Sequence, residues 1–469
     1  MYCKHTKHNT IDTSTLQHIS REHQRPVRWF DAPWLDPVRV RGQIVALHQY
    51  DWLGRPFAIG FAALLCFVLA GPTSALEIGA LPFAVVWLLR CIRFGDGRRV
   101  TWSLLLQPIT LAFLAWACWC AALIVGMPSQ REAWNELAAA RWSWALLALP
   151  FVGFDRSRWI LFIAVGFLCV NLGQLVEALG HHFNIASLEF KNYPDRLAAW
   201  LDPVSGASAM TAALGLVLPL AFMGRGKPRT LAIVASIAGF SGIIATGSRG
   251  AWIAASLLVL VVGAVAIKQS RSRISPRSVA IAIVATALVA VGGGILARGI
   301  IASRVESAAH DLSLVLNRGD YLSDTGLRLF VAERAAQFVL AHPLTGIGPG
   351  QFHTQVLAGI TPENETLRAR VPSHAHNTIL HLAATTGVPG VLLWILMFTL
   401  GLRNAWLYGS RGGWGTLAAG PFFGLVGLAL VSGTDVVQLN QQSSAMLFVL
   451  LGLSPSLPFI FSREPSVQS

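Results

Sequence analysis

A cluster of three histidines is the first feature of this sequence whose residue types suit chemistry. His374, His376 and His381 lie in the stretch PSHAHNTILHLAATTGVPG, which covers residues 372–390. A neutral imidazole accepts a proton near pH 7, so His376 is a candidate general base. The His-x-His spacing also occurs in metal sites, but no cysteine or carboxylate lies nearby to complete one, so we expect no metal. The alternative role is structural, as helix-capping rings at a membrane boundary, and it suits His381 best.

Basic residues close to apolar runs form the second set of candidates. Arg249, in ATGSRGAW, stands between two apolar runs with almost no loop, and its alternative role is to extend toward lipid headgroups. Arg328 lies in the stretch GLRLFVAERAAQFVLAHPL. Lys191 and Arg196 lie in the loop HHFNIASLEFKNYPDRLAAWLDPVSG. Arginines near a membrane that face the interior of a helix bundle are usually functional, so these residues are candidates for a site near the membrane surface.

The stretch around Arg328 predicts an amphipathic helix that ends before Pro343. Its apolar residues recur at helical spacing, and the residue before a proline is disfavoured in helices. The apolar positions are Leu327, Phe330, Val331, Ala335 and Phe338. The next segment, GIGPGQF at residues 346–352, is a glycine-rich turn that serves either as a connector or as a place where a ligand approaches the backbone.

Membrane helices are the elements that must position these residues. The chain has 469 residues, of which 54% are hydrophobic and 13% charged, a composition that excludes an ordinary soluble protein. We predict an all-α polytopic membrane protein of about twelve spans, each an apolar run of roughly 17–25 residues. The predicted spans are 57–70, 76–92, 102–126, 142–154, 158–179, 203–223, 229–246, 250–267, 277–298, 377–402, 413–433 and 443–461.

Segments outside the spans divide the chain further. Residues 1–56 are predicted to form a cytoplasmic tail without a cleavable signal peptide, and residues 462–469 form a second cytoplasmic tail. Transmembrane helices occupy residues 57–297 and 376–461. Residues 298–375 form one large loop, predicted to be periplasmic, and loops of that length are usually functional. The six cysteines fall in the first tail or in spans, so no disulfide framework is predicted.

The distribution of charge predicts the orientation. Most of the 36 Lys and Arg residues fall on one side of the membrane, whereas acidic residues are more frequent on the other side. The positive-inside rule then places both termini in the cytoplasm. The net charge of +13 therefore indicates contact with anionic membrane lipid, and not with nucleic acid.

The helix that follows His376 is predicted to be broken. A continuous helix from Asn377 to Leu402 would be about 39 Å long, which exceeds a hydrocarbon core of about 30 Å. Gly387 and Pro389 interrupt it. We therefore predict a short helix from His376 to Thr386 at the outer boundary and a span that starts near Pro389.

Two sequence patterns resemble a known family. The string His-Asn-x9-Gly-x-x-Gly, which starts at His376, follows the turn HPLTGIGPGQF, and ATGSRGAW precedes both. This combination resembles the signature of the bacterial O-antigen ligase and polymerase superfamily of membrane glycosyltransferases. The resemblance implies that His376 is the essential histidine and that Arg249 and Arg328 bind a diphosphate. Arg196 matches loosely, and Lys191 is a further phosphate-binding candidate.

The resemblance also implies a fold and a function. Members have a glycosyltransferase C-type-like membrane fold and need neither a cofactor nor a metal. The implied reaction transfers polysaccharide from undecaprenyl diphosphate to the lipid A core oligosaccharide, in lipopolysaccharide biosynthesis at the periplasmic face of the inner membrane. Asn377, His374 and Asp435 are expected to support the site. Direct displacement by the acceptor hydroxyl predicts inversion at the anomeric carbon.

Three alternatives stay open. Val391 follows the motif where threonine is frequent in the ligases, and a polymerase of the same superfamily is one alternative. A protein O-oligosaccharyltransferase, which uses a protein hydroxyl as acceptor, is the second. The third is a lipid or glycan transporter, which would carry ionisable residues near the membrane midplane on broken helices. The predicted spans here are nearly free of such residues, which disfavours the transporter.

Overall fold

The computed structural model describes residues 104–127, 130–149, 156–183, 196–270, 298–412 and 417–460, together with a few isolated positions. Within these residues every regular element is a helix, which confirms the all-α class. The predicted spans at 57–70, 76–92 and 277–298 lie almost wholly outside the described residues, as do both predicted tails.

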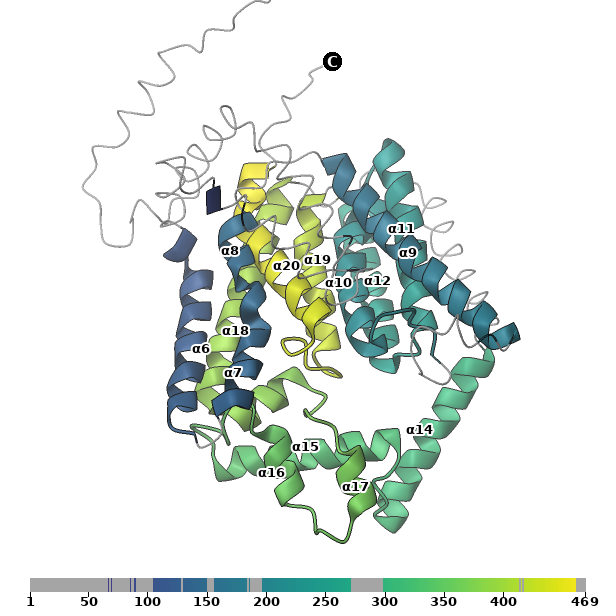
Figure 1. The fold of residues 1–469 in the computed structure, drawn as a ribbon. Coiled ribbons are helices and arrows are strands. Elements are labelled where there is room, and N and C mark those ends of the chain that lie inside the picture. The colour runs from purple at the N-terminus through teal and green to yellow at the C-terminus, as the bar shows by residue number, and fades with distance from the viewer. Residues whose placement is uncertain are drawn as a thin grey trace, which may run out of the picture.

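Six of the described helices are long and apolar enough to cross a membrane (Figure 1). They are α6 (Pro108–Val125), α9 (Arg156–Phe183), α10 (Pro203–Met223), α11 (Gly226–Ala245), α12 (Arg249–Ser270) and α18 (Thr378–Gly412). The shorter η6 (Leu417–Ala419) and α19 (Gly420–Val431) lie with α20 (Gln441–Ile460) in the same bundle. This arrangement fits a multi-pass membrane protein, while the total of about twelve spans stays a prediction.

The predicted span at 142–154 differs from the observed structure. A helical run starts twelve residues earlier, as α7 (Gln130–Ala138), η3 (Ala139–Trp144) and α8 (Ala145–Ala148). The start of α7 carries Arg131 and Glu132, so a search for apolar runs passes over it. The prediction therefore found the apolar second part of this run and missed its polar first part.

Helix α10 lies at the centre of the bundle. It is almost entirely buried and packs on α11, α12, α19 and α20. Its sequence is rich in small residues, which allow helix backbones in a membrane bundle to approach closely. At Gly215, a Cβ atom would collide with the backbone of Phe423 and Gly424 in α19. The bundle therefore relies on backbone contact at this crossing.

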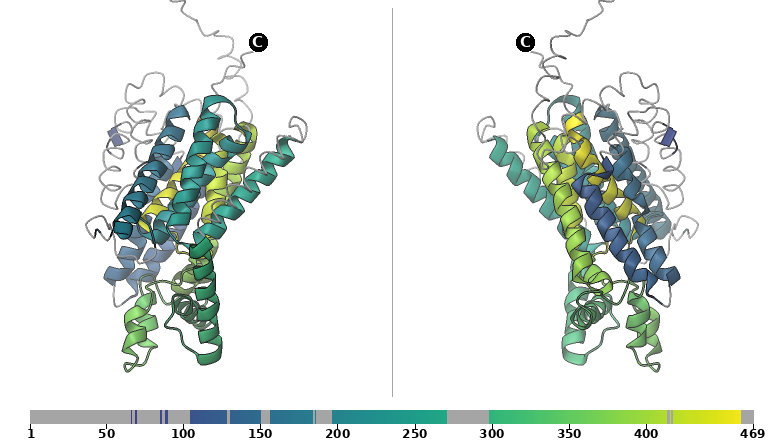
Figure 2. Two further views of the ribbon diagram at one scale, coloured as in Figure 1. Left: turned by 90° about the vertical axis from the view of Figure 1, so that its right-hand side faces the viewer. Right: turned by 90° about the vertical axis from the view of Figure 1, so that its left-hand side faces the viewer.

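Four further helices form a separate layer at one end of the bundle (Figures 1 and 2). They are α14 (Arg298–Arg318), α15 (Asp324–Ala341), α16 (Phe352–Ala358) and α17 (Glu365–Arg370). The amphipathic helix predicted around Arg328 is thus confirmed as α15. It buries the predicted face against α16 and α17, in a small core that also contains Ala375 and Ala384. Since Ala384 belongs to α18, this core attaches the loop helices to the bundle.

Helix α18 is two helices joined at a break, as predicted. Gly387 has φ 70° and ψ −179°, so the backbone leaves the helical conformation there. A positive φ of this kind favours glycine because it has no Cβ atom. The first half of α18 therefore runs from Thr378 to the break and the second half continues to Gly412.

The glycine-rich turn at 346–352 contacts this break. The backbone N–H groups of Ile347 and Gly348 donate hydrogen bonds to the carbonyls of Ala384 and Thr385, at 2.8 and 2.9 Å. The Trp119 indole donates to the carbonyl of Thr386 at 2.8 Å. These carbonyls would otherwise lack partners at the end of a helix. The turn is therefore a connector, the first of its two predicted roles.

Candidate active site

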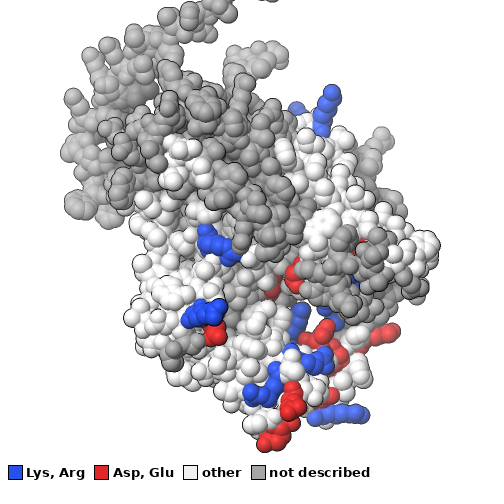
Figure 3. Space-filling model, viewed as in Figure 1, with Lys and Arg blue, Asp and Glu red and all other residues white. Residues whose placement is uncertain are grey.

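Three arginines from separate segments converge where the loop helices meet the bundle. Arg196 precedes α10, Arg249 begins α12 and Arg328 lies in the second turn of α15. Burial lowers the pKa of the Arg328 guanidinium, and the charges of Arg196 and Arg249 lower it further, whereas Asp324 and Asp435 raise it. On the face shown in Figure 3, most charged side chains gather over the loop helices. The three arginines thus bring positive charge to this end of the bundle, where acidic side chains also gather.

The turn between α11 and α12 fixes the position of Arg249. The backbone N–H of Ser248 donates to the Thr246 hydroxyl at 3.2 Å. The Trp252 indole donates at 3.1 Å to two carbonyls in the last turn of α11, those of Ile243 and Ile244. These contacts satisfy groups at the end of α11, so the next helix starts immediately and presents Arg249 in its first turn.

The segment that carries Arg196 is attached to the same end of α11. The backbone N–H of Leu197 donates to the carbonyl of Ala245 at 3.0 Å. The Gln174 amide donates to the carbonyls of Leu197 and Gly242, at 2.9 and 3.0 Å. Arg196 is therefore held beside the turn that positions Arg249.

Arg328 is placed by the capped start of α15. The Ser323 hydroxyl accepts a hydrogen bond from the backbone N–H of Gly326 at 3.1 Å, which caps the helix. Buried residues on either side of Arg328, Leu327 and Phe330 among them, fix the rotation of the helix. Asp324 in the first turn lies 3.7 Å from the Arg196 guanidinium and forms an ion pair with it. This ion pair connects α15 to the segment before α10.

The two histidines before α18 stack closely. The ring centroids of His374 and His376 lie 4.4 Å apart with an interplanar angle of 55°. His376 has φ 52°, in the left-handed region that non-glycine residues adopt at a cost of about 1–3 kcal/mol, typically at functional sites. Its buried Nδ1 atom has no hydrogen-bond partner among the described residues. The surrounding fold therefore holds His376 in an unfavourable backbone conformation with one ring nitrogen unused.

Burial keeps both rings neutral. It lowers the pKa of His376 to about 3, with smaller contributions from the charges of His374 and Arg328. It also lowers the pKa of His374 to about 4, where the charges of His381 and Arg328 act in the same direction. Both imidazoles are consequently neutral at pH 7 in the unliganded protein, and the influence of Arg328 on both shows that the histidines lie close to the arginine cluster.

Asn377 positions His376 through backbone contacts. Its side-chain oxygen accepts a hydrogen bond from the backbone N–H of Leu380 at 2.9 Å, so it caps the first half of α18. Its side-chain nitrogen donates to the carbonyl of Gly433 at 3.2 Å, in the loop between α19 and α20. Both ends of the amide are thus engaged by the backbone, which makes Asn377 a positioning residue.

Asp435, in the same loop, is a buried carboxylate with a complete set of donors. It accepts hydrogen bonds from the Ser208 hydroxyl at 3.0 Å, the Val436 backbone N–H at 2.8 Å and the Asn440 amide at 3.0 Å. Burial raises its pKa, and these hydrogen bonds oppose the rise. Its carbonyl accepts from the Thr378 hydroxyl at 2.9 Å. Asp435 therefore ties α10 to the start of α18.

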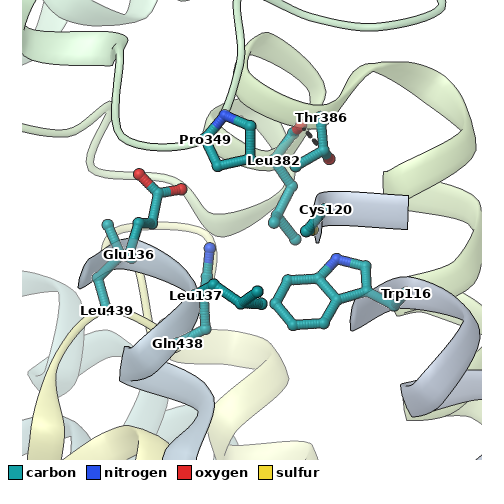
Figure 4. Close-up of a pocket in the computed structure, with 9 residues that line it drawn as sticks. All are labelled: Trp116, Cys120, Glu136, Leu137, Pro349, Leu382, Thr386, Gln438 and Leu439. Carbon is teal, nitrogen blue, oxygen red and sulfur yellow. Dashed lines mark hydrogen bonds between the residues drawn. The ribbon is translucent and has the colours of Figure 1, made fainter. Parts of the chain in front are cut away.

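A small pocket borders the first half of α18, where Leu382 and Thr386 line it (Figure 4). Glu136 of α7 lines it and accepts a hydrogen bond from the backbone N–H of Gly350 at 2.7 Å. Its other oxygen lies 3.4 Å from Nε2 of the fully buried His381. Gln438 also lines this pocket. Glu136 thus joins α7, the glycine-rich turn and α18.

The structure therefore brings together most of the predicted residues. Arg196, Arg249 and Arg328 lie near His374 and His376, while Lys191 lies outside the described residues. Sequence reasoning missed Asp324 and Glu136, because each acts on a residue far away in the sequence. Among the residues that the structure describes, no three His, Cys, Asp or Glu side chains come together as a set that could hold a metal ion.

The comparisons with known proteins point to one family. None of the curated proteins matches this chain. Residues 231–395 match the family model described as O-antigen ligase. The matched segment contains Arg249, Arg328 and His376, together with the loop helices and the break in α18. This segment of the chain is therefore similar to the O-antigen ligase family.

Proposed function

We propose that this protein is an O-antigen ligase, which transfers polysaccharide from undecaprenyl diphosphate to a sugar hydroxyl of the lipid A core oligosaccharide. The family match supports a glycosyltransferase role within the ligase and polymerase superfamily. The convergence of three arginines beside a buried, neutral histidine is the observation that carries the specific proposal. We place the reaction on the periplasmic face of the inner membrane, with both termini in the cytoplasm.

The arginines would stabilise the leaving group. As the glycosidic bond breaks, negative charge develops on the lipid diphosphate, and groups that stabilise this charge lower the barrier. Arg249 and Arg328 come from different segments and lie close enough for their charges to interact, so we propose that they bind opposite sides of one diphosphate. Arg196 contributes a third charge and is held by Asp324 in the absence of the donor.

His376 would accept the proton of the attacking hydroxyl. The acceptor oxygen forms a bond to the anomeric carbon while the bond from that carbon to the diphosphate oxygen breaks, and the hydroxyl proton passes to the imidazole. A pKa of about 3 makes the free ring neutral but weakly basic. The bound diphosphate is anionic and favours the protonated ring, so donor binding strengthens the base when it is needed. A single displacement inverts the anomeric centre, and a product of retained configuration would contradict this step.

The proposed reaction needs no metal and no cofactor. The arginine cluster can balance the charge of a diphosphate without a divalent cation. Glycan transfer should therefore continue in the presence of EDTA. Loss of transfer in EDTA and its recovery with added Mg²⁺ would contradict this part of the proposal.

Reconstitution tests the proposal against its rivals. Purified protein in vesicles is supplied with carrier-linked glycan and lipid A core oligosaccharide. A ligase attaches glycan to the core, whereas a polymerase produces longer carrier-linked chains, and a protein O-oligosaccharyltransferase requires a protein acceptor. The variant His376→Ala should lower transfer by about 10²–10⁴-fold while remaining inserted and folded. A transporter would tolerate this substitution, and wild-type activity in the variant would refute the proposed role of His376.

A further inference from the structure

The C-terminal end of α15 exposes two large apolar side chains. Leu340 is 83% exposed and Leu344, just after the helix, is 67% exposed. Single exposed leucines are common on water-soluble surfaces and need no explanation. These two lie four residues apart at the end of a helix that buries Leu327, Phe330 and Val331 on its other face, so their exposure depends on the surfaces beside them.

The second half of α18 continues this apolar surface. The backbone N–H of Val388 donates a hydrogen bond to the carbonyl of Pro343 at 2.8 Å. A Cβ atom on Gly387 would collide with the carbonyl of Leu344. The turn after α15 therefore lies against the first residues of the second half of α18. This half exposes Val388, Leu392 and Leu396, which recur at the four-residue spacing of one helix face.

The end of α6 reaches the same level of the molecule. The glycine-rich turn that follows Leu344 approaches Met127, just beyond the end of α6, since a Cβ atom on Gly348 would collide with the Met127 side chain. Val125, the last residue of α6, is also strongly exposed. Helices α6 and α18 are both candidate membrane spans. Leu340 and Leu344 thus lie beside the ends of two helices whose outer faces suit lipid.

We infer that Leu340 and Leu344 are embedded in the membrane and contact phospholipid acyl chains. Transfer of an apolar side chain from water into the acyl-chain region of a bilayer is favourable. The lipid-facing residues of α6 and α18 indicate how deep Leu340 and Leu344 lie in the bilayer. The end of α15 is then a membrane anchor, and its first turns carry Arg328. This anchor therefore sets the depth of Arg328, the proposed phosphate-binding residue, relative to the bilayer. The inference does not depend on glycan transfer.

Photo-crosslinking tests the anchor directly. The photoreactive residue p-benzoylphenylalanine replaces Leu340 or Leu344 in the full-length protein, in vesicles of phosphatidylethanolamine and phosphatidylglycerol. The matched control replaces Leu316, which is 74% exposed on α14, a helix that packs mainly on α15. After irradiation, mass spectrometry should find phospholipid adducts at positions 340 and 344 at several times the yield at position 316.

Three results would overturn the inference. Equal adduct yields at positions 340, 344 and 316 would show that the leucines have no special contact with lipid. Crosslinks between two copies of the chain would show that a second protomer covers the patch. Crosslinks to another protein in native membranes, without lipid adducts, would assign it to a protein partner. Because adduct formation needs no substrate, an inactive enzyme with lipid adducts would leave the anchor intact and refute only the proposed function.

Discussion

The two halves of α18 are consecutive in sequence but have different surroundings. In the first half, Leu382, Ala384 and Thr385 are fully buried against the bundle and the loop helices. In the second half, Leu392 and Leu396 are about half exposed on a face that suits lipid. The break at Gly387 separates two unlike segments. The first half begins beside the strained His376 and the arginines, whereas the second half resembles an ordinary membrane span. One chain segment can therefore hold a reactive group at the membrane boundary and still cross the membrane.

The largest expected effect is the loss of activity when His376, just before the first half of α18, is replaced. A substitution on the lipid-facing second half should have almost no effect on activity. Replacing His376 with alanine removes the proposed general base, which typically contributes 10²–10⁴-fold to a rate. We expect kcat for glycan transfer to fall by about that factor. The measurement is a reconstituted transfer assay on protein whose folding is checked by size-exclusion chromatography.

Two controls frame this result. The variant Leu392→Ala changes a lipid-facing side chain in the second half and should leave kcat within about twofold of wild type. The variant His342→Ala removes an exposed histidine in the loop and should do the same. If either control loses as much activity as His376→Ala, the proposed division of labour between the halves is wrong.

The second prediction concerns the arginines that face the start of the first half. Replacing Arg249 or Arg328 with alanine removes charge-assisted hydrogen bonds worth about 1.5–3 kcal/mol, so transfer should fall by roughly 10- to 100-fold. Arg334 is the matched control, because it lies on α15 and donates hydrogen bonds to Gln337 and to the carbonyl of Gly359. Similar tolerance at all three positions, measured as kcat/KM for the donor, would refute the diphosphate site.

The third prediction concerns Gly387, the residue at the break between the two halves of α18. The variant Gly387→Ala introduces a Cβ atom at a positive φ and against the Leu344 carbonyl. We expect a loss of stability of about 1–3 kcal/mol, since alanine is disfavoured in this conformation. Thermal unfolding monitored by circular dichroism should show a lower Tm. The variant Gly433→Ala is the control, because its nearest neighbour would be in ordinary contact, and an equal Tm in the two variants would contradict the account.

The smallest expected effect is a difference between the pH profiles of kcat and kcat/KM, which depends on the surroundings of His376. Burial together with His374 and Arg328 lowers its pKa to about 3, so the free enzyme keeps a neutral ring from about pH 5 to pH 8. No acid limb from this group should appear in kcat/KM over that range. The bound diphosphate raises the pKa, so the acid limb of kcat should lie at higher pH than that of kcat/KM. An acid limb of kcat/KM near 6.5, the ordinary histidine value, would contradict a buried neutral ring.

The sequence predicts those features of the fold that depend on residues close together in the chain, such as the buried face of α15 and the break in α18. The spacing of Leu327, Phe330 and Val331 fixed the buried face of α15, because a helix repeats every 3.6 residues. The break at Gly387 followed from the length of the apolar run and from one glycine and one proline. The convergence of Arg249 and Arg328 near His376 was expected only through a family resemblance, since nothing local relates these positions.

The contacts that complete the site depend on tertiary packing. Glu136 lies in a polar segment that precedes an apolar run, and nothing around it indicates a bond to Gly350. The ion pair between Asp324 and Arg196 likewise joins segments that meet only in the folded chain. Asn377 is predicted to support the site, and in the folded chain its amide forms hydrogen bonds with the backbone of Leu380 and Gly433. Contacts of this kind cannot be predicted from the sequence, because the two partners come together only when the chain folds.

The hydrogen bonds from the glycine-rich turn to the end of the first half of α18 limit how the loop layer can open. Lifting the turn would strip partners from the carbonyls of Ala384 and Thr385, and each buried, unpaired carbonyl costs about 1–3 kcal/mol. The bond between Glu136 and Gly350 would break in the same motion. This edge of the loop layer is therefore held to the bundle, so we expect a bulky glycan to enter from another edge, away from the glycine-rich turn.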